Sequence, residues 1–232
     1  MTTLELHNAS LADSVRFWNK AARKYAASAI ADPQGYERTL RRVLGILMPS
    51  DHVLELGCGT GTTALRLAPA TARFLATDIS PAMLEIARSK LVGAPQGVHG
   101  MLNFELADAN ASLSAPVAAG WDVVLAFNLL HLVPDIDASL AQVVRHLRPG
   151  GRFISKTPCI GQMNPLVPYV ALPVMRALGL APPVRALKQD ELVAAIKRSG
   201  LIIEGIEHHA SAGPSRDWRP FVIASKQRLK PI

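Results

Sequence analysis

Residues 53–61 read VLELGCGTG and combine a short apolar run with three alternating glycines, Gly57, Gly59 and Gly61. The apolar run predicts a buried strand, and the helical spacing of apolar residues in 60–67 predicts that a helix follows it. Glycines at such a junction leave room for a ligand to approach the backbone, and the first turn of the helix offers unpaired N–H groups. The stretch therefore predicts a ligand-binding turn in an α/β sheet, in preference to a tight turn that binds nothing.

The rest of the chain alternates short apolar runs with helically spaced segments. After the strand at residues 52–56, strands are predicted at residues 73–77, 102–106, 122–127, 152–156, 201–207 and 221–225. Helices are predicted at residues 13–30, 33–48, 60–67, 135–147 and 189–199 and from residue 81 onward, and residues 148–151 are predicted to form a turn. Strands separated by helices pair in parallel, whereas the last two strands have no helix between them and must run antiparallel. The predicted fold class is α/β, with a doubly wound, mostly parallel, seven-stranded Rossmann-like sheet.

The residues around the glycine turn indicate what kind of ligand it binds. Asp78, at the end of the next predicted strand, is placed where a carboxylate accepts hydrogen bonds from two ribose hydroxyls. The glycine spacing is G-x-G-x-G and not the G-x-G-x-x-G of dinucleotide sites, and Glu55 comes two residues before the first glycine. A carboxylate is a poor neighbour for a pyrophosphate and a good one for an ammonium or sulfonium cation. We therefore expect a nucleoside ligand with a cationic part.

Five segments in order carry a family resemblance: VLELGCGTG, ATDISPAMLEIAR, LADAN, WDVVLAFNLLHLV and LRPGGRF. Residues 43–156, which contain these segments, resemble class I S-adenosylmethionine-dependent methyltransferases. Within that class they are similar to the small-molecule branch of ubiquinone and menaquinone-biosynthesis methyltransferases. The resemblance implies S-adenosyl-L-methionine as cofactor and an enzyme that methylates a small, hydrophobic or amphipathic acceptor. Methylation of a phospholipid or nucleic acid, a non-catalytic S-adenosylmethionine-binding module and a nicotinamide-dependent oxidoreductase are the alternatives.

The resemblance also implies a set of cofactor-binding residues at the ends of the first four strands: Glu55, Gly57, Cys58, Gly59, Gly61, Asp78, Ile79, Met83, Asp108, Ala109, Phe127 and Asn128. In it Glu55 would face the methionine portion, Asp78 the ribose and Asp108 the adenine amino group. Met83 is equally typical of a core position.

Three further residues are site candidates. The run FWNKAARKYA, residues 17–26, resembles the entry helix of the same branch, so Trp18 and Tyr25 would close over the cofactor unless they only pack one helix on another. His131 follows the fourth strand, where such folds gather their active sites, and is the candidate general base or else a packing group. The sequence Asn-Leu-Leu-His at 128–131 lacks the Pro-Pro-Tyr of amino-group methyltransferases, which is unfavourable for nucleic-acid bases.

We expect one domain, residues 1–232, with four parts in chain order. They are an N-terminal helical cap (1–48), a cofactor-binding core (49–158), an insertion after the fifth strand (159–187), and a last helix with the antiparallel strand pair (188–232). The insertion is apolar, is interrupted by prolines, contains no acidic residue and carries Arg176 and Arg185. It is predicted either to form a lid over the substrate or to complete the core as a helix pair.

The composition of the chain indicates its cellular compartment and the kinds of partner to expect. With only two cysteines, Cys58 and Cys159, and a polar N-terminal segment without a signal-peptide pattern, the chain is expected in the cytoplasm, and its apolar insertion is too interrupted to span a membrane. The net charge of +7 is concentrated toward the two ends of the chain. We expect a small-molecule substrate, no specific nucleic acid and at most peripheral contact with anionic surfaces. The adjacent His208 and His209 lack further ligands at metal-site spacing, so no metal site is predicted and both are expected to be solvated.

Overall fold

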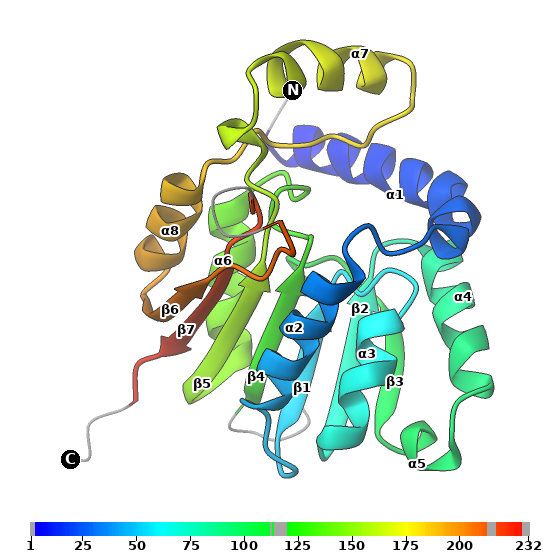
Figure 1. The fold of residues 1–232 in the computed structure, drawn as a ribbon, viewed down its shortest axis with the longest axis vertical. Coiled ribbons are helices and arrows are strands. Elements are labelled where there is room, and N and C mark those ends of the chain that lie inside the picture. The colour runs from blue at the N-terminus through cyan, green and yellow to red at the C-terminus, as the bar shows by residue number, and fades with distance from the viewer. Residues whose placement is uncertain (1–2, 112, 114–119, 213–216, 229–232) are drawn as a thin grey trace.

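The computed structural model describes residues 3–111, 113, 120–212 and 217–228. Its seven-stranded sheet has the order β3-β2-β1-β4-β5-β7-β6 (Figure 1). The strands are β1 (His52–Leu56), β2 (Arg73–Asp78), β3 (Leu102–Leu106), β4 (Trp121–Phe127), β5 (Leu147–Lys156), β6 (Leu201–Glu207) and β7 (Phe221–Lys226). The first five strands are parallel, and β7 is antiparallel to both β5 and β6. The predicted fold class and the antiparallel pair are confirmed.

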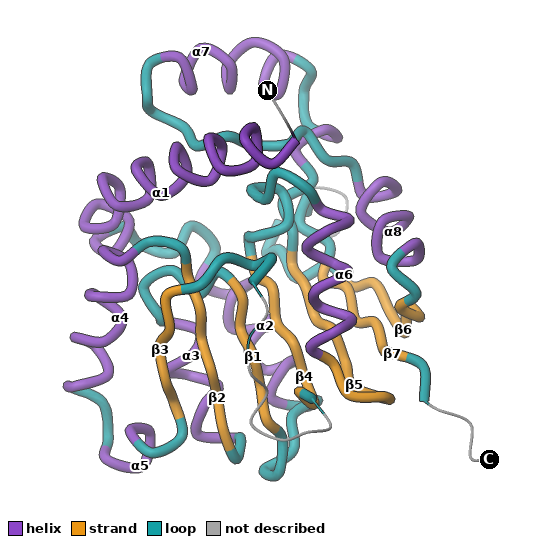
Figure 2. The backbone as a smooth tube through the Cα atoms, turned by 180° about the vertical axis from the view of Figure 1, so that it is seen from behind, coloured by secondary structure: helices purple, strands orange, loops and turns teal. Residues whose placement is uncertain are grey.

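Helices cover both faces of the sheet (Figure 2). They are α1 (Thr3–Ala27), α2 (Pro33–Leu44), α3 (Thr62–Leu67), α4 (Pro81–Val92), α5 (Gln96–His99), α6 (Ile136–His146), α7 (Leu172–Ala177) and α8 (Gln189–Arg198). One buried cluster packs α2, α3 and α4 against the sheet and contains Val53 of β1, whereas the other packs α6 and α8 and contains Leu54 and Leu56. Because successive side chains of a strand point to opposite faces, the apolar run of β1 contributes to both cores.

The predicted start and end of the first helix are wrong. A helix was expected from residue 13 to residue 30, but α1 extends from Thr3 to Ala27. The helix continues through Asp13 toward the N-terminus, and Ser14 Oγ donates to Ser10 O, one turn earlier, at 3.0 Å. The C-terminal end comes earlier because Ser28 N bonds to Tyr25 O, three residues back, at 3.2 Å.

Residues 148–151 were expected to form a turn before the fifth strand, and this is wrong because they lie within β5. The register between β4 and β5 shifts between the pairs Trp121↔Leu147 and Val123↔Arg152, so the Pro-Gly-Gly run forms an irregularity inside the strand. The third helix begins at Thr62 and not at residue 60, because Gly61 has a φ of 72°, which interrupts a right-handed helix.

His209 was expected to be solvated, and this is wrong. Its side chain is only 7% exposed, and its ring lies 4.6 Å from that of Phe221. Its Nδ1 pairs with Thr39 Oγ1 at 3.0 Å and its Nε2 with Glu207 Oε2 at 3.1 Å. The segment after β6 is buried because His209 contacts Thr39 of α2 and Phe221 of β7, and its backbone N–H donates to Asp217 Oδ2 at 2.8 Å.

Only the two ends of the insertion, at Cys159 and Leu187, belong to the core. Its large apolar side chains are exposed, with Leu166 at 65%, Tyr169 at 68% and Leu178 at 67%. Figure 1 shows α7 beyond α1, at the end of the molecule to which the carboxyl ends of the parallel strands point. A helix pair completing the core is therefore wrong. Within the described residues, no helix is both long and apolar enough to cross a bilayer.

Candidate functional site

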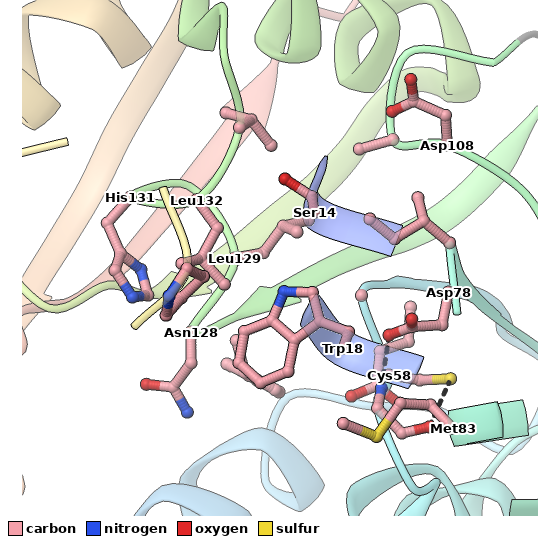
Figure 3. Close-up of a pocket in the computed structure, with 18 of the residues that line it drawn as sticks. Ser14, Trp18, Cys58, Asp78, Met83, Asp108, Asn128, Leu129, His131 and Leu132 are labelled. Carbon is pink, nitrogen blue, oxygen red and sulfur yellow. Dashed lines mark hydrogen bonds between the residues drawn. The ribbon is translucent and has the colours of Figure 1, made fainter. Parts of the chain in front are cut away.

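A cavity of about 480 Å³ lies where β1, β2 and β4 end, and α1 covers it (Figure 3). Every site residue predicted from the sequence lines this cavity except Gly61. They come from five separate regions of the chain, namely α1, the end of β1 with the turn after it, the end of β2 with the start of α4, the loop after β3, and the end of β4 with the loop after it. The parallel topology brings these regions together because the carboxyl ends of parallel strands share one edge of the sheet.

The carboxylate of Asp78 links the glycine turn to the next strand. Its Oδ2 accepts a hydrogen bond from Gly59 N at 2.8 Å and its Oδ1 accepts one from Ser80 N at 2.9 Å. Burial raises the pKa of Asp78, and these backbone donors oppose the shift. Each carboxylate oxygen has a further lone pair, so Asp78 is held in position with acceptor capacity remaining.

Glu55 is buried in the same wall, with 2% of its side chain exposed. Its Oε2 has no hydrogen-bond partner in the described part of the chain. Burial, and then the nearby charge of Asp78, raise the pKa of Glu55 to about 8. A buried carboxyl oxygen without a partner costs free energy unless a cation or donor reaches it. Glu55 is therefore suited to a cationic ligand in the cavity.

The three glycines of the turn are needed for different reasons, although all have positive φ. A Cβ at Gly59 would meet only Tyr25 Cε1, at 3.8 Å, so this position opens to the cavity. A Cβ at Gly57 would lie 2.8 Å from Leu129 Cδ1. A Cβ at Gly61 would lie 2.7 Å from Phe104 Cζ, away from the cavity, so Gly61 allows α3 to pack closely against its neighbours and contributes no lining.

One face of α1 forms the cover of the cavity. Leu11, Ser14, Trp18 and Tyr25 line it, at intervals of three, four and seven residues that place them on one side of a helix. The rings of Trp18 and Tyr25 meet edge to face with centroids 6.1 Å apart. Asn19 Oδ1 accepts a hydrogen bond from Ser80 Oγ at 2.7 Å, which fixes α1 to the N-terminus of α4. Sequence reasoning missed Leu11 and Ser14, although their spacing from Trp18 was a usable signal.

The wall near β3 and α4 contains Ile79, Met83, Asp108 and Ala109, which all line the cavity. Met83 is 2% exposed, so it is both a core residue and a lining residue. Asp108 Oδ1 accepts a hydrogen bond from Asn110 N at 3.1 Å, which orders the loop after β3.

His131 lies in the loop after β4, beyond Phe127 and Asn128, and 9% of it is exposed. Its Nδ1 has no hydrogen-bond partner within the described residues. Burial lowers the pKa of His131 to about 4, so its imidazole is neutral at pH 7. The backbone of this loop is anchored to the insertion, because His131 O accepts a hydrogen bond from Arg185 N at 2.8 Å.

The part of the cavity around His131 is apolar, and sequence reasoning missed most of it. The apolar lining residues are Leu129, Leu132, Val133, Pro134, Pro158, Pro182 and Val184. The insertion contributes only Pro182 and Val184, and not its exposed residues between 163 and 178. The cavity thus has an acidic end, at Glu55, Asp78 and Asp108, and an apolar end around His131.

Comparison with known proteins adds to this geometry. Residues 54–153 match a family described as "Methyltransferase domain". The chain is similar to a malonyl-[acyl-carrier protein] O-methyltransferase of Serratia marcescens, with 30% identity over 64% of this chain and 54% of that protein. It is also similar to a demethylmenaquinone methyltransferase of Leptospira interrogans, with 32% identity over 52% of this chain and 47% of that protein. The chain thus covers about half of these relatives, and only 5% of the reducing polyketide synthase Preu2 of Preussia isomera that it also matches.

Solved structures share the fold over most of the chain. The [4+2]-cyclase SpnF superposes with a TM-score of 0.66 and 18% identity, over 83% of this chain and 81% of that one. An S-adenosylmethionine dependent methyltransferase from Mesorhizobium loti superposes with a TM-score of 0.62 and 23% identity, over 84% of this chain and 99% of that one. At such identities the likeness concerns the fold alone.

Proposed function

We propose that this chain, whose residues 54–153 form a methyltransferase domain with the class I fold, transfers a methyl group from S-adenosyl-L-methionine to a small hydrophobic or amphipathic acceptor. The observation that carries the proposal is Glu55, a buried carboxyl with an unpartnered oxygen beside Asp78 in a cavity of about 480 Å³. An acidic end of this kind favours a ligand that bears a positive charge over a dinucleotide with a pyrophosphate.

The residues present fit this methyl donor. Asp78 would accept hydrogen bonds from the ribose hydroxyls with the lone pairs that Gly59 N and Ser80 N leave unused. Glu55, protonated in the free protein at neutral pH, would release its proton when the cation binds and so neutralise the positive charge, and the open position at Gly59 would admit the ligand to the backbone. S-adenosyl-L-methionine supplies an electrophilic methyl group on a sulfonium, so alignment with a nucleophile in a dry site is the main requirement.

The acceptor is inferred from the apolar end of the cavity. Prolines and branched aliphatic side chains there, including Leu132, Val133 and Val184, favour a hydrophobic portion of a small molecule. The relatives' names refer to malonyl-[acyl-carrier protein] and demethylmenaquinone, which supports acyl and quinol compounds as the first classes to test. A nucleic-acid acceptor is not favoured, because the narrow apolar wall offers few polar groups for a base.

We assign His131 the role of general base for an acceptor hydroxyl. Burial lowers the pKa of His131 to about 4, so its imidazole is unprotonated at neutral pH and a ring nitrogen is available to receive a proton, although a base with this pKa is weak. The proton lost by the hydroxyl as the new bond to the methyl carbon forms would pass to the imidazole. The apolar surroundings exclude competing water.

A second function is compatible with the same fold. The [4+2]-cyclase SpnF shares this architecture, so the fold by itself does not require methyl transfer, and the alternative is a module that binds the nucleoside without transferring its methyl group. In the first function the methyl group moves to an acceptor, whereas in the second it stays on S-adenosyl-L-methionine.

The test combines binding with turnover. Calorimetric titration with S-adenosylhomocysteine and with NADPH should give binding of the first alone, and Asp78→Ala should weaken it by about 1–3 kcal/mol. A radiolabelled methyl group from S-adenosyl-L-methionine should then appear in one class of acceptor among quinols, fatty acids, acyl-carrier-bound acyl groups and phospholipids. The variant His131→Gln should slow this transfer by about 100-fold or more without weakening S-adenosylhomocysteine binding. Binding of NADPH alone would overturn the proposal. Tight S-adenosylhomocysteine binding with no labelled product from any class would favour the second function.

A further inference from the structure

A smaller cavity of about 120 Å³ adjoins the main one, between α2 and the ends of β4 and β5. The two cavities share Thr63, Phe127 and Asn128 in their linings, so they are neighbours at the same edge of the sheet. The charged residues that line the smaller cavity are Asp32, Lys156 and Arg219. Its size suits a small polar group and is too small for a nucleotide.

Lys156, the last residue of β5, is a buried cation with 8% of its side chain exposed. Its Nζ donates to Thr39 Oγ1 at 2.8 Å, and in the described part of the chain no carboxylate forms an ion pair with it within 4.0 Å. The Thr39 hydroxyl itself donates to Gly35 O at 2.8 Å and contacts His209 Nδ1 at 3.0 Å. An ammonium has three protons to donate, so a single neutral partner leaves this buried charge poorly compensated.

The acidic residues nearby are already engaged by backbone donors. Asp217 accepts hydrogen bonds from the backbone N–H groups of His209, Ala210 and Arg219, and the Arg219 Nε lies 3.8 Å from its Oδ1. Asp32 accepts from the backbone N–H groups of Gly35 and Ser211 and from the Ser211 hydroxyl. These carboxylates therefore stabilise loops. The two cations that line the cavity, Lys156 and Arg219, keep N–H groups that can donate hydrogen bonds to a further anion.

We propose that Lys156 and Arg219 bind a carboxylate group of the methyl acceptor, whose reacting end lies in the main cavity. The claim that the carboxylate belongs to a methyl acceptor rests on the proposed function, whereas the claim that Lys156 and Arg219 form an anion site does not. Burial lowers the pKa of Lys156, and the positive charges of Arg219 and Arg38 act in the same direction, whereas the charges of Asp217 and Asp32 oppose the shift without cancelling it. The site is coupled to the loop that carries His131, because Asn128 N donates to Lys156 O at 2.8 Å. The α-carboxylate of S-adenosyl-L-methionine is the other source of the same chemistry.

The probe is hexanoate, a carboxylate with a short apolar tail, and its neutral counterpart is 1-hexanol. Dissociation constants are measured by NMR titration on the full chain, with and without saturating S-adenosylhomocysteine. We expect hexanoate to bind in both states, to bind more tightly than 1-hexanol, and to bind about tenfold more weakly to Lys156→Met and to Arg219→Gln. Lys156→Met should remain folded, because replacing a buried, poorly paired charge with an apolar side chain is seldom destabilising.

The matched control is Lys226→Met. Lys226 is a partly buried lysine at the end of β7, whereas Phe221, which pairs with Lys156 in the sheet, lies at the start of that strand. Among the residues that the structure describes, Lys226 Nζ donates to the carbonyls of Val144 and Leu147 alone, so hexanoate binding should not change. Equal hexanoate affinity in Lys156→Met and the unmodified protein would overturn the anion site. If Lys156→Met instead weakens S-adenosylhomocysteine but not its analogue without the α-carboxylate, the donor and not the acceptor supplies the carboxylate. Absence of any S-adenosylhomocysteine binding would overturn the proposed function, and hexanoate titration of the free protein would still test the site.

Discussion

At the scale of single residues, Glu55 has an environment that differs sharply from that of a surface carboxylate. It is buried, one of its oxygens has no partner among the described residues, and Asp78 adds a second negative charge nearby. These three features all disfavour the ionised form, which explains why the pKa of Glu55 is raised to about 8. In the free protein this residue is therefore protonated at neutral pH.

We predict that Glu55 makes the free protein less stable as pH rises. The folded-state pKa of about 8 exceeds the ordinary value of 4.5, so the folded state binds more protons than the unfolded state between these values. Between pH 6.5 and 8.5 the free energy of unfolding should fall by about 2 kcal/mol because of this group. Urea denaturation of the unmodified protein and of Glu55→Gln at both pH values tests this. His131 has a pKa of about 4 in the folded protein and an ordinary value of 6.5, so in this window it titrates only in the unfolded state, and the comparison with Glu55→Gln cancels that contribution. An equal pH dependence in both proteins would contradict the prediction.

The glycine turn yields a prediction that separates binding from packing. Gly59→Ala places its methyl group in open space beside the cavity, so beyond the strain of its positive φ, about 1–2 kcal/mol, the main effect should be weaker S-adenosylhomocysteine binding. Gly61→Ala forces its methyl group against Phe104 and Ala87, so it should lower the melting temperature more. In the folded fraction Gly61→Ala should bind the ligand nearly as well as the unmodified protein. Calorimetry measures the binding and thermal denaturation the melting temperature. If Gly61→Ala weakened binding more and Gly59→Ala lowered the melting temperature more, the roles assigned to the two glycines would be wrong.

At the scale of elements, α1 and the insertion both reach the site, but in different ways. The helix α1 covers the cavity with one face and is fixed to α4 through Asn19. The insertion touches the cavity only through Pro182 and Val184, and the backbone of Arg185 bonds to His131. Its helix α7 leaves apolar side chains such as Val174 exposed, at 54%.

We predict that hydrogen exchange distinguishes these contributions. S-adenosylhomocysteine should slow exchange in α1 around Trp18 and Tyr25, because ligand closes that face. An acceptor should add protection at Arg185 and Leu187, and α7 should exchange rapidly in every state because its side chains are exposed. Mass spectrometry of peptides from the free and ligand-bound protein measures each segment. Slow exchange of α1 in the free protein, unchanged by ligand, would exclude its role as a moving cover.

At the scale of the whole molecule, charge and exposed apolar surface determine which partners are attracted. The net charge is +7, and the insertion combines exposed apolar residues with Arg176 and no acidic residue. These features favour anionic surfaces in general and do not by themselves make a specific site. The cytoplasmic location and the single-domain organisation stay predictions of the sequence.

We predict only weak, salt-sensitive association with nucleic acid. Affinity for a mixed-sequence DNA duplex should fall steeply between about 50 and 200 mM salt, because the attraction is non-specific and comes from released counterions. Vesicles with anionic phospholipid should retain more of the protein than neutral vesicles at low salt, since the same charge acts there. Fluorescence titration and vesicle sedimentation measure the two. A DNA or RNA complex that persists at physiological salt would favour the nucleic-acid methyltransferase alternative.

The order of strands and helices, the antiparallel end of the sheet and most of the acidic end of the cavity could be read from the chain, because each depends on local pattern or on a motif of contiguous residues. Glu55, Asp78 and the glycine turn lie within short segments, and parallel topology alone brings their ends together. Element boundaries such as the ends of α1 were less predictable, since several local hydrogen-bonding patterns compete there.

The apolar end of the cavity and the smaller anion site depended on contacts between distant segments. Leu132 and Val184 come from separate loops, and Lys156 meets Thr39 across 117 positions of sequence, so no local period signals either arrangement. The raised pKa of Glu55 and the packing role of Gly61 likewise arise from neighbours that only folding brings near. Burial and long-range packing are properties of the assembled chain, and for that reason the acidic end of the cavity could be predicted from sequence and the apolar end could not.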